Sequence, residues 1–157
     1  MAQISSITRV GKTEPFELQV ARGQISWHHK VHKFGFNPLI NDTEETIWDV
    51  GGIYSYPSTA VKMTATSTDG ANDEDVQVTI QGLDADYNEI SETVTLNGTS
   101  AVTTTATFLR VFRARVETAG SSSGAEGVIT VTVGGNELAR LDPQYDNQTL
   151  QAAYTVP

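Results

Sequence analysis

VQVTIQGLDADYNEISETVTLNG, residues 76–98, alternates apolar side chains with threonine and other polar residues around a short Asp/Asn turn. The same rhythm returns in VTTTATFLRVFRARVET at 102–118 and in GVITVTVGG at 127–135. Alternation with a period of two places one side of each strand on a core and the other side in water. Val and Thr suit such strands because branching at Cβ fits a half-buried pleated surface.

Similar runs continue this pattern through the C-terminal two thirds of the chain. Strands are predicted over 61–68, 76–83, 89–96, 101–118 (one long strand or a bent pair), 128–133, 136–141 and 148–156. About six to eight short strands separated by turns are typical of a β-sandwich. We therefore predict an all-β protein, with an antiparallel β-sandwich or jelly-roll-like domain over residues 61–157.

Residues 1–60 have a different character. ITRV at 7–10 and PFELQVA at 15–21 are each compatible with a short strand, but the remainder has no sustained period. This part contains both tryptophans and all three histidines of the chain. Aromatic residues without periodicity indicate an extended segment that is anchored by individual side chains. We therefore predict an extended N-terminal docking segment over 1–60, whose contacts with a partner are concentrated in 22–56.

The candidate interface residues of this segment are aromatic side chains and histidines. They are Trp27, His28, His32, Phe34, Phe36, Trp48, Tyr54 and Tyr56. Buried aromatic side chains supply much of the binding energy of protein interfaces, which is the reason for choosing them. The alternative is that Trp27 and Trp48 close the end of this protein's own core, since tryptophan is usually highly buried.

Three arginines, Arg110, Arg113 and Arg115, interrupt the strand pattern of 101–118. Strict alternation would place Arg110 on the same face as Phe112 and Ala114, so we predict a bulge near residue 110. Two interpretations remain open for these arginines. They are solvated edge charges that discourage association between sheets, or they form an interface with acidic turns of another copy.

Composition excludes several functions. The net charge is −9, of which residues 51–157 contribute −8, and an acidic surface repels the phosphates of nucleic acids. The absence of cysteine rules out disulfides, thiol nucleophiles and zinc sites with cysteine ligands. No apolar run approaches the roughly 20 residues that cross a bilayer, so we expect no membrane partner.

Two clusters resemble metal sites without satisfying their rules. Asp84, Asp86 and Asn88 have the spacing that opens a calcium loop, but Glu89 and Thr95 stand where the loop needs Gly and Glu. We interpret this stretch as a hairpin turn. The three neighbouring histidines, His28, His29 and His32, lack the glutamate of a zinc hydrolase motif. We therefore expect no catalytic residue, no metal and no cofactor, and hence no enzyme.

Several stretches, taken together, carry a resemblance to a known group of proteins. The most specific are KFGFN at 33–37, ETIWDVGG at 45–52 and SETVTLNGT at 91–99, and PFELQVARGQI and NQTLQAAYTVP lie near the two ends. The chain resembles, over nearly its whole length, a group of structural proteins from the virions of tailed bacteriophages, mostly from marine and freshwater phages. The resemblance implies a component of the particle that is assembled in the cytoplasm of the bacterial host.

Within that group, we expect a capsid decoration or cement protein that binds the major capsid protein and stabilises the head. By analogy with decoration proteins of this size, we expect a symmetric homo-oligomer, most simply a trimer. The alternatives are a tail or neck adaptor, a fibre-base protein, and a carbohydrate-binding β-sandwich for attachment to the host. The number of copies in each particle separates decoration from the tail and neck locations.

Overall fold

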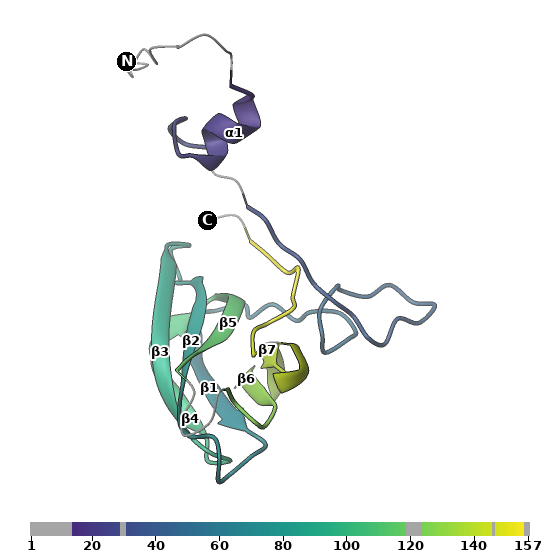
Figure 1. The fold of residues 1–157 in the computed structure, drawn as a ribbon, viewed down its shortest axis with the longest axis vertical. Helices are drawn as coiled ribbons and strands as arrows, with labels where there is room; N and C mark the ends of the chain where they lie inside the picture. Colours follow the sequence, from purple (N-terminus) through teal and green to yellow (C-terminus); the bar gives the residue numbers. More distant parts are fainter. Residues whose placement is uncertain (1–13, 29–30, 119–123, 146, 156–157) are drawn as a thin grey trace. The chain divides into compact units, whose positions relative to one another are not determined.

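The computed structural model describes residues 14–28, 31–118, 124–145 and 147–155 (Figure 1). The chain divides into two compact units, Met1–His32 and Lys33–Pro157. The predicted boundary at residue 60 therefore does not coincide with the observed division, because residues 33–60 belong to the same unit as the strands. Among the described residues, no helix is long and apolar enough to cross a membrane.

The first unit contains the short helix α1, Phe16–Ala21, so the strand predicted for 15–21 is wrong. Leu, Gln, Glu and Ala favour helix, and Pro15 provides a suitable start. Gly23, with φ +67°, ends the helix, and the amides of Gly23 and Gln24 bond back to the carbonyls of Val20 and Gln19. No residue of α1 is buried. The other strand predicted before residue 15, over 7–10, lies outside the described residues.

The second unit is a sandwich of two antiparallel sheets, as predicted (Figure 1). One sheet has the strand order β4-β1-β6-β7 and the other has the order β3-β2-β5. The strands are β1 (Val61–Ser67), β2 (Glu74–Leu83), β3 (Glu89–Asn97), β4 (Val102–Phe108), β5 (Arg110–Thr118), β6 (Ile129–Val133) and β7 (Asn136–Leu141), and a 3-10 turn, η1, spans Pro143–Tyr145. The stretch 101–118 is thus a bent pair of strands that meet at Leu109.

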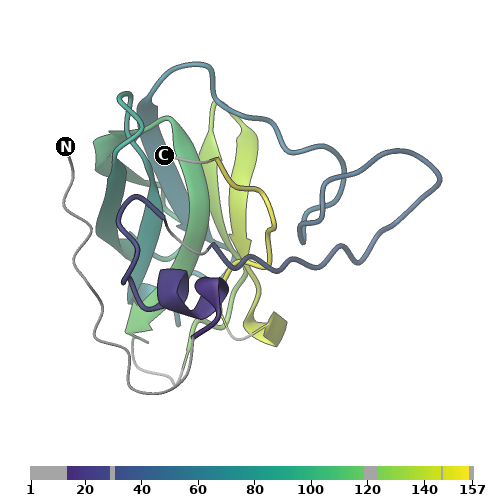
Figure 2. The same ribbon diagram turned by 90° about the horizontal axis from the view of Figure 1, so that it is seen from above.

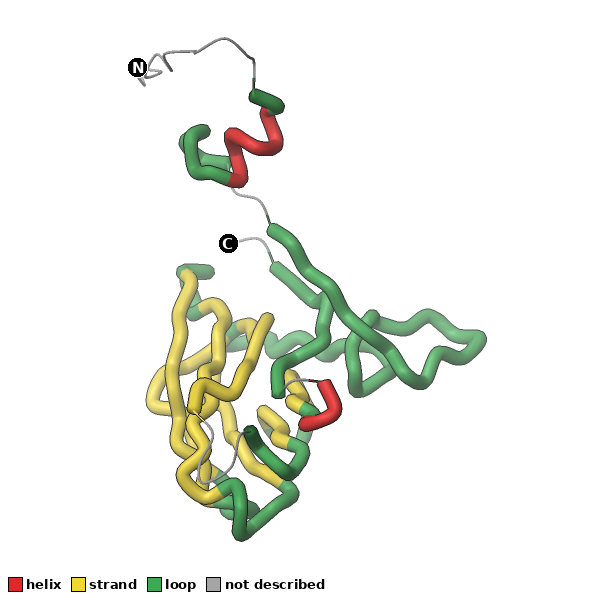
Figure 3. Tube along the Cα trace, in the orientation of Figure 1, coloured by secondary structure: helices red, strands yellow, loops and turns green. Residues whose placement is uncertain are grey.

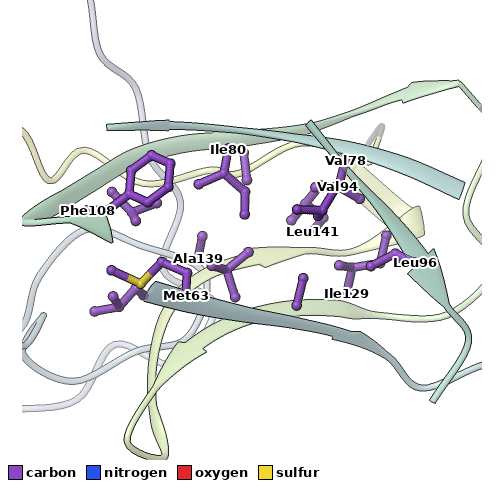
Figure 4. Packing of buried hydrophobic residues seen from close by; sticks show 14 of the residues in the cluster. Met63, Val78, Ile80, Val94, Leu96, Phe108, Ile129, Ala139 and Leu141 are labelled. Carbon is purple, nitrogen blue, oxygen red and sulfur yellow. The ribbon is translucent and has the colours of Figure 1, made fainter. Parts of the chain in front are cut away.

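Apolar side chains from the two sheets meet in a single core (Figure 4). Val78 and Ile80 of β2 face Met63 of β1 and Ile129 of β6 across the sandwich, and all four are fully buried. Each such side chain contributes about 1.5–3 kcal/mol when it leaves water. The period-two pattern of the sequence is therefore the pattern of core and surface in the sheets.

A bulge in β5 decides which of its side chains reach the core. Gln81 pairs with Arg113 and Gly82 pairs with Val111, which leaves Phe112 as the extra residue. The bulge predicted near residue 110 therefore exists, with Phe112 as its extra residue. As a result, Val111 takes the buried position together with Ala114, and Phe112 is only partly buried.

The carboxylate of Glu92 in β3 links the two sheets at one edge of the sandwich. It accepts hydrogen bonds from the backbone amides of Thr105 and Ala106 in β4, both at 2.7 Å. These amides lie where the register between β1 and β4 shifts, between Lys62 and Thr64. Glu92 thus satisfies amides that would otherwise offer an edge for pairing with another strand.

The strand predicted over 148–156 is wrong. Residues 147–149 run beside β5, where the amide of Val116 donates to the carbonyl of Asn147 and the amide of Thr149 donates to the carbonyl of Ala114. Only one isolated bridge, between Arg115 and Gln148, forms there. Beyond Thr149 the backbone hydrogen-bonds with residues 36 and 47, while side chains such as Gln151 keep contact with β5, so no regular ladder develops.

Gly82 is required by the close approach of β2 to β5. A Cβ atom on Gly82 would lie 1.9 Å from the carbonyl oxygen of Arg110 and 2.8 Å from the ring of Phe108. We expect Gly82→Ala to lower the free energy of unfolding by about 3 kcal/mol or more, which corresponds to a loss of roughly 6–12 °C in melting temperature.

Gly70→Ala is the matched control, because its new Cβ would make only ordinary contacts at 3.6 Å with Thr99. Differential scanning calorimetry of both variants measures the difference. Equal melting temperatures for the two variants would contradict the packing described for β2 and β5.

Candidate functional site

Residues 33–56 form a long loop that extends away from the strands (Figures 1 and 2) and contains no helix or strand (Figure 3). We call it the 33–56 loop. Its root is hydrogen-bonded to the C-terminal segment: the amide of Phe36 donates to the carbonyl of Leu150 at 3.0 Å, and the amide of Ala152 donates to the carbonyl of Ile47 at 2.9 Å. The C-terminal segment therefore lies between two stretches of the loop.

Gly35 and Asn37 explain why the sequence KFGFN forms the root of the loop. A Cβ atom on Gly35 would lie 2.5 Å from the carbonyl oxygen of Ile47 and 2.7 Å from the amide nitrogen of Ala152. The side-chain amide of Asn37 donates to Glu45 at 2.5 Å and to the carbonyl of Thr46 at 3.3 Å. Glycine permits the close approach, and asparagine ties the two sides of the loop together.

Trp48 and Tyr54 fix the loop to the sandwich. They are 4% and 3% exposed, and their ring centroids are 5.0 Å apart. The indole N–H of Trp48 donates to the carbonyl of Gly51 at 2.8 Å, and the hydroxyl of Tyr54 donates to the carbonyl of Val111 at 2.9 Å. Burial raises the pKa of the Tyr54 phenol, which therefore remains a donor. The prediction that Trp48 and Tyr54 bind a partner is wrong, because both rings belong to the core.

Arg110 also serves the fold of its own chain. Its guanidinium lies 5.0 Å from the ring centroid of Tyr56 and donates to the carbonyl of Pro57 at 2.7 Å. A further hydrogen bond, from Nε, reaches the hydroxyl of Thr155 at 3.2 Å. Arg110 is thus bound to its own chain, which neither of the two interpretations, a solvated edge charge or an interface with another copy, had included. Arg115 pairs with Glu117, and Arg113 is exposed.

Large apolar side chains that remain exposed are concentrated on the 33–56 loop. Ile40 is 81% exposed, Ile53 is 71% exposed and Leu39 is 68% exposed. The complete set on the loop is Phe34, Phe36, Leu39, Ile40, Ile47, Ile53 and Tyr56. In the described part of 57–155, the only large apolar residue with comparable exposure is Tyr87. Large apolar side chains that are exposed together on one segment are typical of an interaction site.

A hollow of about 380 Å³ lies within this surface and is lined by Phe36, Ile40 and Ile47 together with polar neighbours. The predicted candidates Phe34, Phe36 and Tyr56 belong to the exposed surface. Sequence reasoning missed the aliphatic members because it looked for aromatic anchors. The available signal was the presence of Leu39, Ile40, Ile47 and Ile53 in a stretch without periodicity, where no amphipathic element could bury them.

The remaining predicted interface residues, Trp27, His28 and His32, lie in the first unit. Trp27 has φ +64° and is 93% exposed. The ring of His28 packs edge-on against Phe16, with centroids 5.6 Å apart, and its Nδ1 lies 3.0 Å from the carbonyl oxygen of Ser26. His32 is exposed. His29, the third member of the histidine cluster, lies outside the described residues.

The carboxylates of the acidic clusters accept hydrogen bonds from backbone amides. Asp84 accepts hydrogen bonds from the amides of Asp86 at 2.8 Å and Asn88 at 2.9 Å, and the Asn88 amide in particular lowers its pKa. Tyr87, with φ 64°, supplies the left-handed residue of the turn. The buried carboxylate of Asp73 accepts from Ser67 and from the amides of Glu126 and Gly127. Among the described residues, no three His, Asp or Glu side chains form a metal-binding group.

No protein-family model, no curated protein and no solved structure matches this chain. The function must therefore be inferred from the residues themselves. The feature of the structure that most resembles a site is the exposed apolar surface of the 33–56 loop.

Trp48 and Ile53 differ sharply in role, although five positions separate them. We expect Trp48→Ala to destabilise the protein by about 3–5 kcal/mol, because the indole fills core volume. Ile53→Ala should change stability by no more than about 0.5 kcal/mol, since the side chain is largely in water. Urea unfolding followed by circular dichroism measures both values. A stable Trp48→Ala variant would show that the indole is not a core residue.

Proposed function

We propose that this chain is a structural protein of a tailed-bacteriophage particle, and specifically a decoration protein that binds the major capsid protein through its 33–56 loop. The resemblance of KFGFN, ETIWDVGG and SETVTLNGT to virion proteins supplies the biological context. The observation that carries the proposal is that the surface of the second unit is divided into an apolar part and a polar part. Nearly all of its large exposed apolar side chains are on the 33–56 loop, and its strands present polar side chains outward.

The outer faces of the sheets support a solvent-facing role for the sandwich. Threonines are frequent on them, and the hydroxyls of the partly exposed Thr66 and Thr130 meet across strands at 3.2 Å. Residues 61–157 carry five basic and thirteen acidic side chains, a net charge of −8. Like charge on the outer surface keeps neighbouring particles apart. The loop then faces the capsid, and the sandwich faces the medium.

A symmetric homo-oligomer, most simply a trimer, fits a position on a capsid lattice. The tail, neck and fibre-base locations use the same kind of surface and differ in the number of copies. A carbohydrate-binding role has less support. Sugar sites commonly use exposed aromatic rings, and Tyr87 is the only strongly exposed ring that the structure describes between residues 57 and 155.

Apolar contact through the loop predicts that polar substitutions there abolish incorporation into particles. We expect the double variant Ile40→Asn, Ile53→Asn to be lost from purified virions by at least about tenfold, because each substitution removes apolar contact area. Its melting temperature should stay near that of the wild type, since both side chains are largely exposed. The measurement is quantitative mass spectrometry of virions made during infection with tagged chains.

Tyr87→Asn is the matched control: it removes an exposed ring from the β2–β3 turn, and asparagine tolerates positive φ. It should be incorporated normally. Hundreds of copies per virion support decoration, and on the order of twelve or fewer would move the proposal to the neck or fibre base. Absence of the wild-type chain from virions would overturn the virion proposal altogether.

A further inference from the structure

Asp49 is a buried carboxylate in the 33–56 loop. It is 5% exposed, and neither of its oxygens has a hydrogen-bond partner. A charged group in such a position is costly unless it is paired, because it loses its hydration without compensation. The neutral acid is far less costly. The side chain is adjacent to Trp48, which anchors the loop in the core.

The cation that acts on Asp49 already has another partner. Arg140 of β7 donates through Nε and Nη2 to the carboxylate of Glu137, at 2.7 and 2.9 Å. Arg140 and Glu137 act on Asp49 with opposite sign, so their effects partly cancel. The amides of Leu150 and of Asp49 itself face the carboxylate without reaching hydrogen-bond geometry.

Burial is the largest influence on this group, and it raises the pKa of Asp49 to about 6. The raised value lies above the 3.8 of an ordinary aspartate, so folding favours the protonated form. The stabilisation from protonation is complete below pH 3.8 and disappears as the pH rises through about 6. The ionised group then sits where the loop, the C-terminal segment and β7 meet.

We propose that Asp49 is a protonation switch that determines how firmly the 33–56 loop is held on the sandwich. In mildly acidic solution the neutral side chain leaves the loop packed. At neutral pH its charge loosens residues 46–54 and makes the apolar surface adaptable. The switch is a property of the isolated chain, and only its consequence for binding rests on the proposed function.

Amide hydrogen exchange of the isolated full chain between pH 4.5 and 8 tests the switch. Asp49→Asn is a near-isosteric variant that mimics the neutral acid. The measured quantity is the ratio of the amide exchange rates of residues 46–54 in the wild type to those in Asp49→Asn, after correction for intrinsic rates. We expect this exchange ratio to rise about tenfold or more between pH 5 and 7.5. The exposed Asp42 of the same loop gives the control Asp42→Asn, which should follow the wild type at every pH.

The difference in melting temperature between Asp49→Asn and the wild type provides a second readout. The other carboxylates titrate in both proteins, so their effects cancel in this difference. The difference between Asp49→Asn and wild type should be small at pH 4.5 and should grow in favour of the variant up to pH 7.5. A constant difference across this range, or a variant that is less stable or unfolded at pH 7.5, overturns the switch.

Virion incorporation separates the two proposals. If the isolated chain shows the pH effect but the wild type never enters virions, the switch stands and the proposed function fails. If the wild type enters virions and the exchange ratio does not change with pH, the function stands and the switch fails.

Discussion

The carbonyl oxygen of Val111 is the point on which the arrangement of the second unit depends. It accepts hydrogen bonds from the hydroxyl of Tyr54 at 2.9 Å and from the side-chain amide of Gln151 at 3.1 Å. The bulge at Phe112 interrupts the ladder with β2 at this position. One backbone group therefore binds the 33–56 loop, the C-terminal segment and the sandwich together, and the absence of a side chain on Gly82 allows β5 to approach closely enough.

This arrangement divides the apolar residues of the loop into two classes. Trp48 and Tyr54 each have a polar atom that finds a backbone acceptor, so their rings can be buried completely. Ile40 and Ile53 lie on parts of the loop that the sandwich does not cover. The loop is consequently attached to the sandwich at Trp48 and Tyr54 and displays Ile40 and Ile53.

The sequence predicted the strands well because their alternation is local information. The positions of β1, β2, β3, β6 and β7 follow directly from period-two runs bounded by turn residues. Features that depend on distant partners could not be predicted in this way. FELQVA alternates as a strand does, but helix propensity and the Gly23 cap prevail. Residues 148–156 alternate too, yet beyond Thr149 their backbone hydrogen-bonds with Phe36 and Ile47 rather than with β5. The exposed apolar residues fall within the segment singled out from the sequence, but Trp48 and Tyr54 are core residues, and only the fold reveals that Val111 offers Tyr54 an acceptor.

Gly35 has a consequence for the order in which the molecule folds. Its backbone is enclosed by the carbonyl of Ile47 and by the amide of Ala152, which lies far along the chain. Contacts between distant parts of a chain form slowly, because each of them closes a long loop and loses its entropy. We therefore expect the root of the loop to form after local strand pairs such as β2 and β3.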